Sequence, residues 1–201
     1  MKQNSSVKIK TLRGRDIYPY IPKIAACRIA IFREYPYLYE GDMLYEERYL
    51  QIYSMTKDAI LVIAEDHEDV IGVVTGLPLL DSMDEVKSLF MKKSIPADRI
   101  FYLGEIILLP EHRGKNIGYR MYQQFEKAVF EKGLYEKIAL CEVVRSENDL
   151  RKPLDYTPLS SFWNRQGYVK YPELVADFFW KEIGANEETK HPMVFWMKNC
   201  S

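Results

Sequence analysis

Cysteine is scarce in this sequence, and its spacing excludes two kinds of stabilised domain. Only Cys27, Cys141 and Cys200 occur among the 201 residues, and none belongs to a C-x-x-C pair. An odd number of widely spaced thiols provides neither a disulfide framework nor the closely spaced ligands of a structural zinc site. We therefore expect reduced thiols and no bound metal.

Long apolar runs and an excess of one charge are also missing. No stretch approaches the roughly 20 apolar residues of a membrane-spanning helix, and the polar residues 1–6 lead into no signal-peptide core. Lys plus Arg number 28 and Asp plus Glu number 29, so the formal net charge is -1 and no global field gathers polyanions. These absences predict a cytoplasmic protein with neither a membrane nor a nucleic acid as its partner.

The sequence does contain enough apolar side chains for one sizeable core. Hydrophobic residues make up 47% of the chain and charged residues 28%, a balance typical of a folded protein rather than a disordered one. A chain of this length most often forms one domain, and no repeat, low-complexity tract or linker divides it. We predict a single domain over residues 1–201, with its core at about 7–198.

The first half of the chain predicts a strand, two helices and a hairpin. The strand alternates apolar and polar residues, Asp16 is placed to cap the first helix, and two β-branched runs flank a charged turn. In order, we expect a strand at 7–12, helices up to about 33 and from 42 to about 53, and strands at 59–65 and 70–76.

The second half alternates between the two kinds of element. A largely buried strand ends at Pro110, and the following helix places Ile117, Met121, Phe125 and Val129 four residues apart on one face. In order, we expect a surface helix at 80–93, a strand at 100–109, a helix at 116–132, a strand at 137–144, a long loop at 145–158, a short helix at 159–165, and strands at 174–182 and 192–198. This order predicts an α/β protein with a mixed sheet.

The stretch between residues 110 and 118 carries the strongest chemical signal. A loop of small residues at the start of a helix directs several free N–H groups to one point, and the helix N-terminus adds about half a positive charge there. Gly114 and Gly118 remove Cβ atoms where phosphate must approach, and Arg113 and Lys115 add positive charge. This arrangement predicts a pyrophosphate site, with an ordinary turn before a helix as the alternative.

Two segments of the sequence resemble those of a known family. The segment LLPEHRGKNIGYRMY resembles the acetyl-CoA loop of the GNAT superfamily of N-acetyltransferases, Q/R-x-x-G-x-G/A, with Arg113, Ile117 and Gly118 matching. FWNRQGY at 162–168 is similar to the late aromatic segment of that family, and the element order agrees over about residues 7–198. The resemblance implies a mostly antiparallel central sheet flanked by helices, with acetyl-CoA as cosubstrate and no metal.

Asn116 departs from the family pattern, because it stands where the middle glycine usually lies. Asn adopts a positive φ angle more readily than other residues with a side chain, so the loop is expected to keep its shape. The cofactor-binding residues that the resemblance implies are Ile107, Leu108, Leu109, Arg113, Gly114, Lys115, Asn116, Ile117 and Gly118. A dinucleotide-binding fold is disfavoured, because its glycine motif belongs to the first strand–helix unit.

The resemblance implies direct attack of an amine on the acetyl thioester. An alkyl amine has a reference pKa of about 10.4, so a base must take its proton near neutral pH. Glu105 is the one ionisable carboxylate in the apolar run that leads to the loop, and members of the family often carry a basic glutamate there. Glu105 is our first choice as the base, Glu142 is the reserve, and a carboxylate paired with a core Arg or Tyr is the alternative reading.

Other parts of the catalytic machinery are less clearly marked. Backbone N–H groups of residues 107–109 are expected, by resemblance, to bind the pantetheine and the developing oxyanion. Trp163 stands where the family often has a tyrosine that protonates the thiolate, so Tyr156 or Tyr168 is expected to replace it, or the thiolate leaves unaided. Cys141 lies in an apolar strand without a patterned histidine, which indicates an inert thiol.

The acceptor is expected to be a primary amine of a small molecule or peptide. The family uses its first two helices to bind the acceptor, and residues 33–53 of this chain are rich in acidic and tyrosine side chains that attract a cation. We place Tyr35, Tyr39, Asp42 and Glu46 in this wall, with a solvated acidic face over a tyrosine-rich core as the alternative.

Two other functions remain open at this stage. A non-catalytic acyl-CoA-binding module would explain the missing tyrosine and the Asn116 substitution, and a nucleotide-binding regulatory domain would prefer ATP or NAD to CoA. Homodimerisation is also left open.

Overall fold

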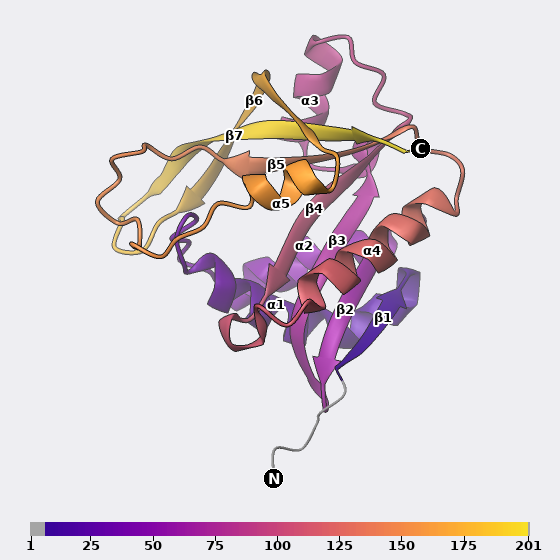
Figure 1. Cartoon of the computed structure of the whole chain (residues 1–201), viewed down its shortest axis with the longest axis horizontal. Helices are drawn as coiled ribbons and strands as arrows, with labels where there is room; N and C mark the ends of the chain where they lie inside the picture. Colours follow the sequence, from indigo (N-terminus) through magenta and orange to yellow (C-terminus); the bar gives the residue numbers. More distant parts are fainter. Residues whose placement is uncertain (1–6, 201) are drawn as a thin grey trace. The chain divides into compact units, whose positions relative to one another are not determined.

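The computed structural model describes residues 7–200 and contains a seven-stranded sheet flanked by helices (Figure 1). The strands follow the order β1-β2-β3-β4-β5-β7-β6. The pairs β1–β2, β2–β3, β5–β7 and β6–β7 are antiparallel, whereas β4–β5 is parallel. The predicted fold class, an α/β protein with a mostly antiparallel sheet, is confirmed.

The chain folds into two compact units. The first comprises residues up to Ile31, Asp42–Leu77 and Leu103–Gly133, and the second comprises Phe32–Gly41, Pro78–Tyr102 and the residues from Leu134 onward. Strand β4 (Ile100–Leu108) contributes its first three residues to the second unit and the remaining six to the first.

The first unit holds the central hairpin and the helices on its two faces. Figure 1 shows helix α4 on one face of its strands and helices α1 and α2 on the other. Its elements are β1 (Lys8–Leu12), the 3₁₀ helix η1 (Gly14–Tyr20), α1 (Ile21–Phe32), α2 (Met43–Met55), β2 (Ile60–Asp66), β3 (Asp69–Pro78), the 3₁₀ helix η3 (Pro110–His112) and α4 (Ile117–Phe130).

Apolar patterning explains these elements. Residues 60–65 of β2 are all buried, as expected of a strand covered on both faces, and β2 pairs with β3 as the predicted hairpin. In α4 the predicted apolar stripe is buried, from Ile117 through Met121 and Phe125 to Val129. Asp42 caps α2, because its carboxylate accepts a hydrogen bond from the Tyr45 N–H at 2.9 Å.

One local prediction in this unit is wrong. Asp16 does not cap a helix but lies inside η1, a 3₁₀ segment that precedes α1. Pro19 cannot donate a hydrogen bond and restricts the preceding residue, so the α-helix begins only at Ile21.

The second unit is built on a long antiparallel hairpin. Its elements are the 3₁₀ helix η2 (Leu79–Asp81), α3 (Asp84–Lys92), the start of β4, β5 (Lys137–Val143), α5 (Ser160–Arg165), β6 (Val169–Lys181) and β7 (Glu188–Asn199). Helix α3 packs against β6, and a shared core includes Phe90, Tyr102, Ala139 and Phe195.

Strands β6 and β7 begin earlier than the sequence predicts. Pro172 lacks an N–H group, and the pairing register with β7 shifts between Tyr171 and Val175. This irregularity lets β6 begin at Val169, although a proline at that point reads as the end of a strand. No helix in the described part of the chain is both long enough and apolar enough to cross a membrane.

Candidate active site

Strand β4 leads to the glycine-containing loop and leaves much of one edge without a strand partner. Its parallel ladder with β5 pairs only Ile100 to Tyr102, so the six following residues have no register partner on β5 within residues 7–200. The Leu109 N–H donates to the Ile71 carbonyl of β3 at 2.9 Å. Since backbone groups alternate between strand edges, the N–H and C=O of Leu108 point to the opposite, open edge.

Gly72 on β3 allows this close approach, and the sequence analysis did not single it out. A Cβ at position 72 would lie 2.7 Å from the Ile107 carbonyl oxygen and 2.9 Å from Leu108 Cδ1. Any side chain would therefore push β4 away. A glycine inside a strand pattern was the available signal, because it often marks a close backbone approach.

Glu105 is buried on β4 in an ion pair with Arg28 of α1. The residue is 8% exposed, and its Oε2 contacts the guanidinium Nη1 of Arg28. Its other oxygen, Oε1, is buried and has no hydrogen-bond partner among the described residues. The alternative reading of the sequence, a carboxylate paired with a core arginine, is therefore present in the structure, together with one buried carboxylate oxygen that none of the described residues satisfies.

A second carboxylate shares the same arginine. Arg28 Nε donates to Glu46 Oε2, and Glu46 on α2 is 1% exposed. The Tyr49 ring lies 4.5 Å from the guanidinium carbon. Burial opposes the charge on Arg28, but Tyr49 and Glu46 raise the pKa of Arg28 above its ordinary value, so its positive charge is kept.

Tyrosine hydroxyls continue this polar cluster towards β3. The Tyr49 and Tyr53 hydroxyls are 3.0 Å apart, and Thr75 Oγ1 donates to the Tyr53 hydroxyl at 3.2 Å. A Cβ at Gly104 would lie 2.6 Å from the Tyr53 oxygen, so the glycine beside Glu105 makes room for that hydroxyl. Burial raises the pKa of Tyr49 well above its ordinary value, which keeps Tyr49 neutral.

The loop before α4 has the backbone conformation that its composition predicts. Gly114 and Asn116 adopt positive φ angles of 72° and 61°. Asn116 thus performs the backbone role that was expected of it in place of a glycine. Arg113 Nε donates to the Leu108 carbonyl at 2.9 Å and Lys115 Nζ to the Glu111 carbonyl at 2.8 Å, so both cations are held beside the loop.

The first turn of α4 leaves space for an anion. Residues 113–116 are exposed, and a Cβ at Gly118 would meet only Leu108 Cδ2, at 4.0 Å. Free N–H groups at this helix end, two cationic side chains and a glycine with open space are the features that favour binding of a pyrophosphate. The residues therefore fit coenzyme A, whose pyrophosphate they would hold.

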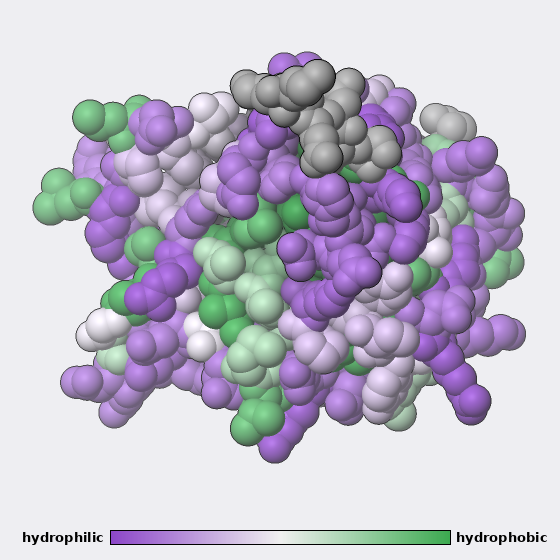
Figure 2. Space-filling model, turned by 90° about the horizontal axis from the view of Figure 1, so that it is seen from below, coloured by the Kyte–Doolittle hydropathy of each residue, from purple (hydrophilic) through white to green (hydrophobic). Residues whose placement is uncertain are grey.

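A cleft of about 490 Å³ lies in the same unit, beside the start of this loop. Its walls come from α1, the β2–β3 turn and the segment Leu109–His112, and they combine alanine, valine and isoleucine with charged residues. The face drawn in Figure 2 has apolar side chains gathered near its middle and hydrophilic ones around them.

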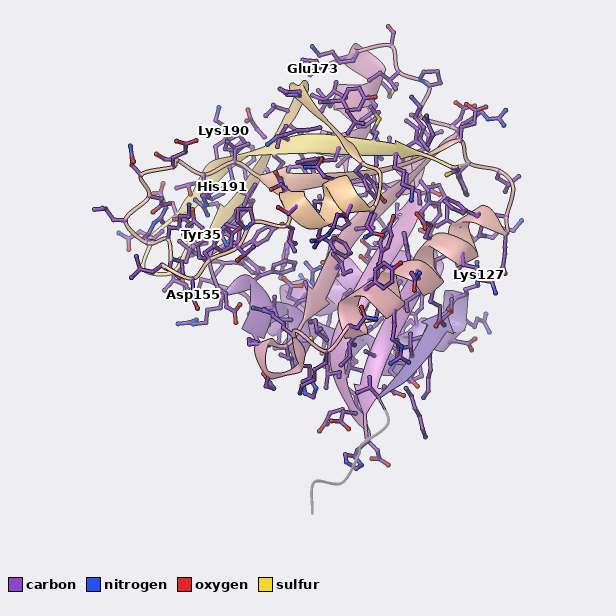
Figure 3. All side chains as sticks on the ribbon, in the orientation of Figure 1. Tyr35, Lys127, Asp155, Glu173, Lys190 and His191 are labelled. Atoms are coloured by element: carbon purple, nitrogen blue, oxygen red, sulfur yellow. The ribbon has the colours of Figure 1, made fainter. Side chains whose placement is uncertain are left out.

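In the second unit, Tyr156 packs against another of the predicted site residues. The Tyr35 and Tyr156 rings meet edge to face, with centroids 4.8 Å apart. Figure 3 shows Tyr35 close to Asp155, the neighbour of Tyr156 in the long loop. Burial, together with Tyr35 and Glu142, raises the pKa of Tyr156, so its hydroxyl keeps its proton at neutral pH. Trp163 is buried at 3% exposure and offers no hydroxyl.

The four residues of the expected acceptor wall have different environments. Tyr35 and Tyr39 belong to the second unit, where Tyr39 forms an isolated bridge with Glu182. Asp42 and Glu46 belong to the first unit, where Asp42 caps α2 and Glu46 is buried against Arg28. Glu46 is therefore not an exposed acidic side chain, because α2 turns this residue towards α1.

Glu142 and Cys141, on β5, have partners of their own. Lys170 Nζ lies 3.4 Å from Glu142 Oε1, and the Tyr102 hydroxyl lies 3.2 Å from Cys141 Sγ. Burial raises the pKa of Cys141 to about 12. A thiol that stays protonated is a poor nucleophile, as the sequence analysis expected.

Comparison with known proteins now decides the family. The model of the acetyltransferase (GNAT) family matches residues 25–152, more than half of the chain and including both β4 and the loop. The chain belongs to the GNAT family of acetyltransferases. No curated protein matches the sequence.

Solved acetyltransferase structures share the fold at low sequence identity. An aminoglycoside 6'-N-acetyltransferase complexed with coenzyme A has a TM-score of 0.59 and 16% identity, covering 96% of this chain and 97% of its own. A putative acetyltransferase from Salmonella typhimurium, solved with acetyl-CoA, has a TM-score of 0.58 and 11% identity over 98% and 95% of the two chains. An N-acetyltransferase from Thermoplasma acidophilum in complex with coenzyme A has values of 0.53 and 15% over 96% and 99%.

Proposed function

We propose that this protein transfers the acetyl group of acetyl-CoA to a primary amine, with Glu105 as the general base. The observation that carries the proposal is the carboxylate of Glu105: it is buried on the strand that leads to the cofactor loop, and within residues 7–200 only one of its oxygens is paired. Membership of the GNAT family supports acyl transfer in general.

Residues 107–118 would bind the cosubstrate. The α4 N-terminus, Arg113 and Lys115 hold the pyrophosphate, and the open Leu108 N–H binds the pantetheine amide. Ile107 and Leu109 line this strand edge, although the Leu109 N–H already donates to β3. Bound acetyl-CoA supplies an activated acyl group as a thioester.

Glu105 removes the proton that the amine must lose. An alkyl ammonium with a pKa of about 10.4 is a poor nucleophile near neutral pH until a base accepts its proton. Oε1 is the acceptor in this proposal, either directly or through one water molecule, while Oε2 remains against Arg28. Burial and this ion pair hold the carboxylate in one orientation.

Tyr156 is the proposed proton donor to the departing thiolate. Its raised pKa keeps the phenol protonated, and packing against Tyr35 fixes the ring. In the acceptor wall we retain Tyr35 and Tyr39 as aromatic contacts for a cationic amine. Asp42 contributes negative charge at the start of α2. Glu46 is buried against Arg28, so it contributes its charge without contacting the acceptor.

The test of this function is Glu105→Gln, which keeps the shape of the side chain and removes its basicity. Steady-state release of CoA with a responsive amine should fall by about 10²–10⁴-fold, the usual contribution of a general base, while calorimetry shows little change in CoA affinity. Glu65→Gln is the matched control, since Glu65 is also a buried carboxylate, paired with Lys10 at 2.5 Å. Full turnover in Glu105→Gln would make Glu105 a structural residue.

A non-catalytic CoA-binding protein is the second candidate. Trp163, buried where the family often has a tyrosine, is the observation that favours it. Tight CoA binding without acetylation of any amine in a broad panel would support this candidate over the enzyme.

A further inference from the structure

The buried cluster around Arg28 holds two carboxylates against one guanidinium group. Two carboxylates, Glu46 and Glu105, contact one guanidinium, and both residues are less than 10% exposed. Of the other titratable groups in the cluster, Tyr49 and Tyr53 are phenols that cannot supply a positive charge. Ionising both carboxylates therefore leaves a net negative charge in a desolvated site, which is strongly unfavourable without a second cation.

The geometry of the cluster separates the roles of the two carboxylates. Glu46, from α2, accepts a hydrogen bond from Nε of Arg28 and is the more deeply buried of the two carboxylates. Glu105, from β4, contacts Nη1 of Arg28 through Oε2. Its Oε1 has no partner among the described residues. Arg28 thus divides its charge between an inner carboxylate and the carboxylate that we assign as the base.

We propose that Glu46 is a positioning residue that keeps Glu105 basic by occupying Arg28. This inference rests on the proposed function, and it explains how a glutamate that faces an arginine can still accept a proton. Without Glu46, the full charge of Arg28 would act on Glu105 and stabilise its ionised form, which makes a weak base. With Glu46 present, repulsion between two carboxylates offsets that attraction.

The same arrangement favours a cationic acceptor. An ammonium group that approaches Glu105 Oε1 would be the second cation of the cluster and would balance its charge. Transfer of the ammonium proton to Oε1 then leaves a neutral amine and a neutral carboxyl group, so the net charge of the cluster and substrate is unchanged.

The central test is the pH profile of kcat/KM in Glu46→Gln. The rate rises with pH as Glu105 loses its proton, so a weaker base moves this rising limb to lower pH. We expect a shift of about one pH unit, the lower end of what one nearby opposite charge causes, with a lower rate on the plateau. Glu65→Gln should leave the limb in place, because Lys10 rather than Arg28 is its partner.

Arg28→Gln provides a test of opposite sign. Loss of the guanidinium removes the group that stabilises ionised Glu105, so the rising limb should move to higher pH. A merely structural role for Glu46 and Arg28 would lower the rate at every pH without displacing the limb. A limb that stays fixed in both variants, or that moves in the same direction in both, would overturn the inference.

A measurement without substrate keeps this inference separable from the proposed function. The ¹³C carboxyl resonance of Glu105, assigned by its loss in Glu105→Gln, should titrate at lower pH in Glu46→Gln than in the unmodified protein. An unchanged titration refutes the role of Glu46 even if the enzyme uses Glu105 as its base. Full turnover of Glu105→Gln refutes the base, whatever the resonance shows.

Discussion

At the scale of single residues, the environment of a side chain decides its chemistry more than its type does. Glu46 reads as part of an acidic surface in the sequence, but in the structure it lies against Arg28 at 1% exposure. The sequence marks Glu105 by its isolation in an apolar strand, and the structure adds its ion pair with Arg28. The sequence suggested a core Arg or Tyr beside Glu105 but could not identify Arg28, because α1, α2 and β4 meet only after folding.

The cysteines provide a prediction at this scale. Burial raises the pKa of both Cys27 and Cys141 to about 12, so only about one thiol in 10⁴ is ionised at pH 8. Iodoacetamide at pH 8 should therefore leave both residues unmodified in the native protein and alkylate them after unfolding, as mass spectrometry of peptides would show. Cys141→Ala should keep its turnover. Rapid native labelling of Cys141 together with loss of turnover in that variant would point to thiol chemistry instead.

At the scale of elements, the helix-start loop was the most predictable part of the site. Its positive-φ positions follow from Gly114 and from the tolerance of Asn116, and the helix after it follows from the apolar stripe of α4. Gly72 was missed, because the need for it arises from the carbonyl of Ile107 on a neighbouring strand. The local sequence predicts contacts within one element, but it does not predict contacts between strands.

Gly118 provides the prediction for this element. Gly118→Glu puts a negative charge at the helix N-terminus where the pyrophosphate is proposed to bind, so calorimetry should show CoA affinity reduced at least tenfold, or about 1.4 kcal/mol. Gly118→Ala is the matched control. The space around the Cβ is open, so both variants should fold, and the alanine variant, which adds a small Cβ but no charge, should weaken CoA binding less than the glutamate variant does. Unchanged affinity in Gly118→Glu would remove this loop from the cofactor site.

At the scale of the whole molecule, the sequence predicted the fold class and the order of the elements, and the family match agrees with both. The single domain over residues 1–201 stays a prediction. Polar clusters far apart in sequence were not foreseen, such as Arg145 and Arg151, which both pair with Glu182 in the second unit. Charged residues in long loops give no periodic signal, so their partners appear only in the folded chain.

The central claim, acetyl transfer from acetyl-CoA to an amine, is tested most directly by following the acetyl group itself. The protein is incubated with acetyl-CoA that carries a deuterated acetyl group and with a panel of primary amines, and the amines are analysed by mass spectrometry. The account predicts an amine that gains one deuterated acetyl group in the presence of the protein, at a rate much reduced in Glu105→Gln. Binding of CoA without a labelled amine would contradict the claim, and equal labelling by Glu105→Gln would contradict only the role of Glu105.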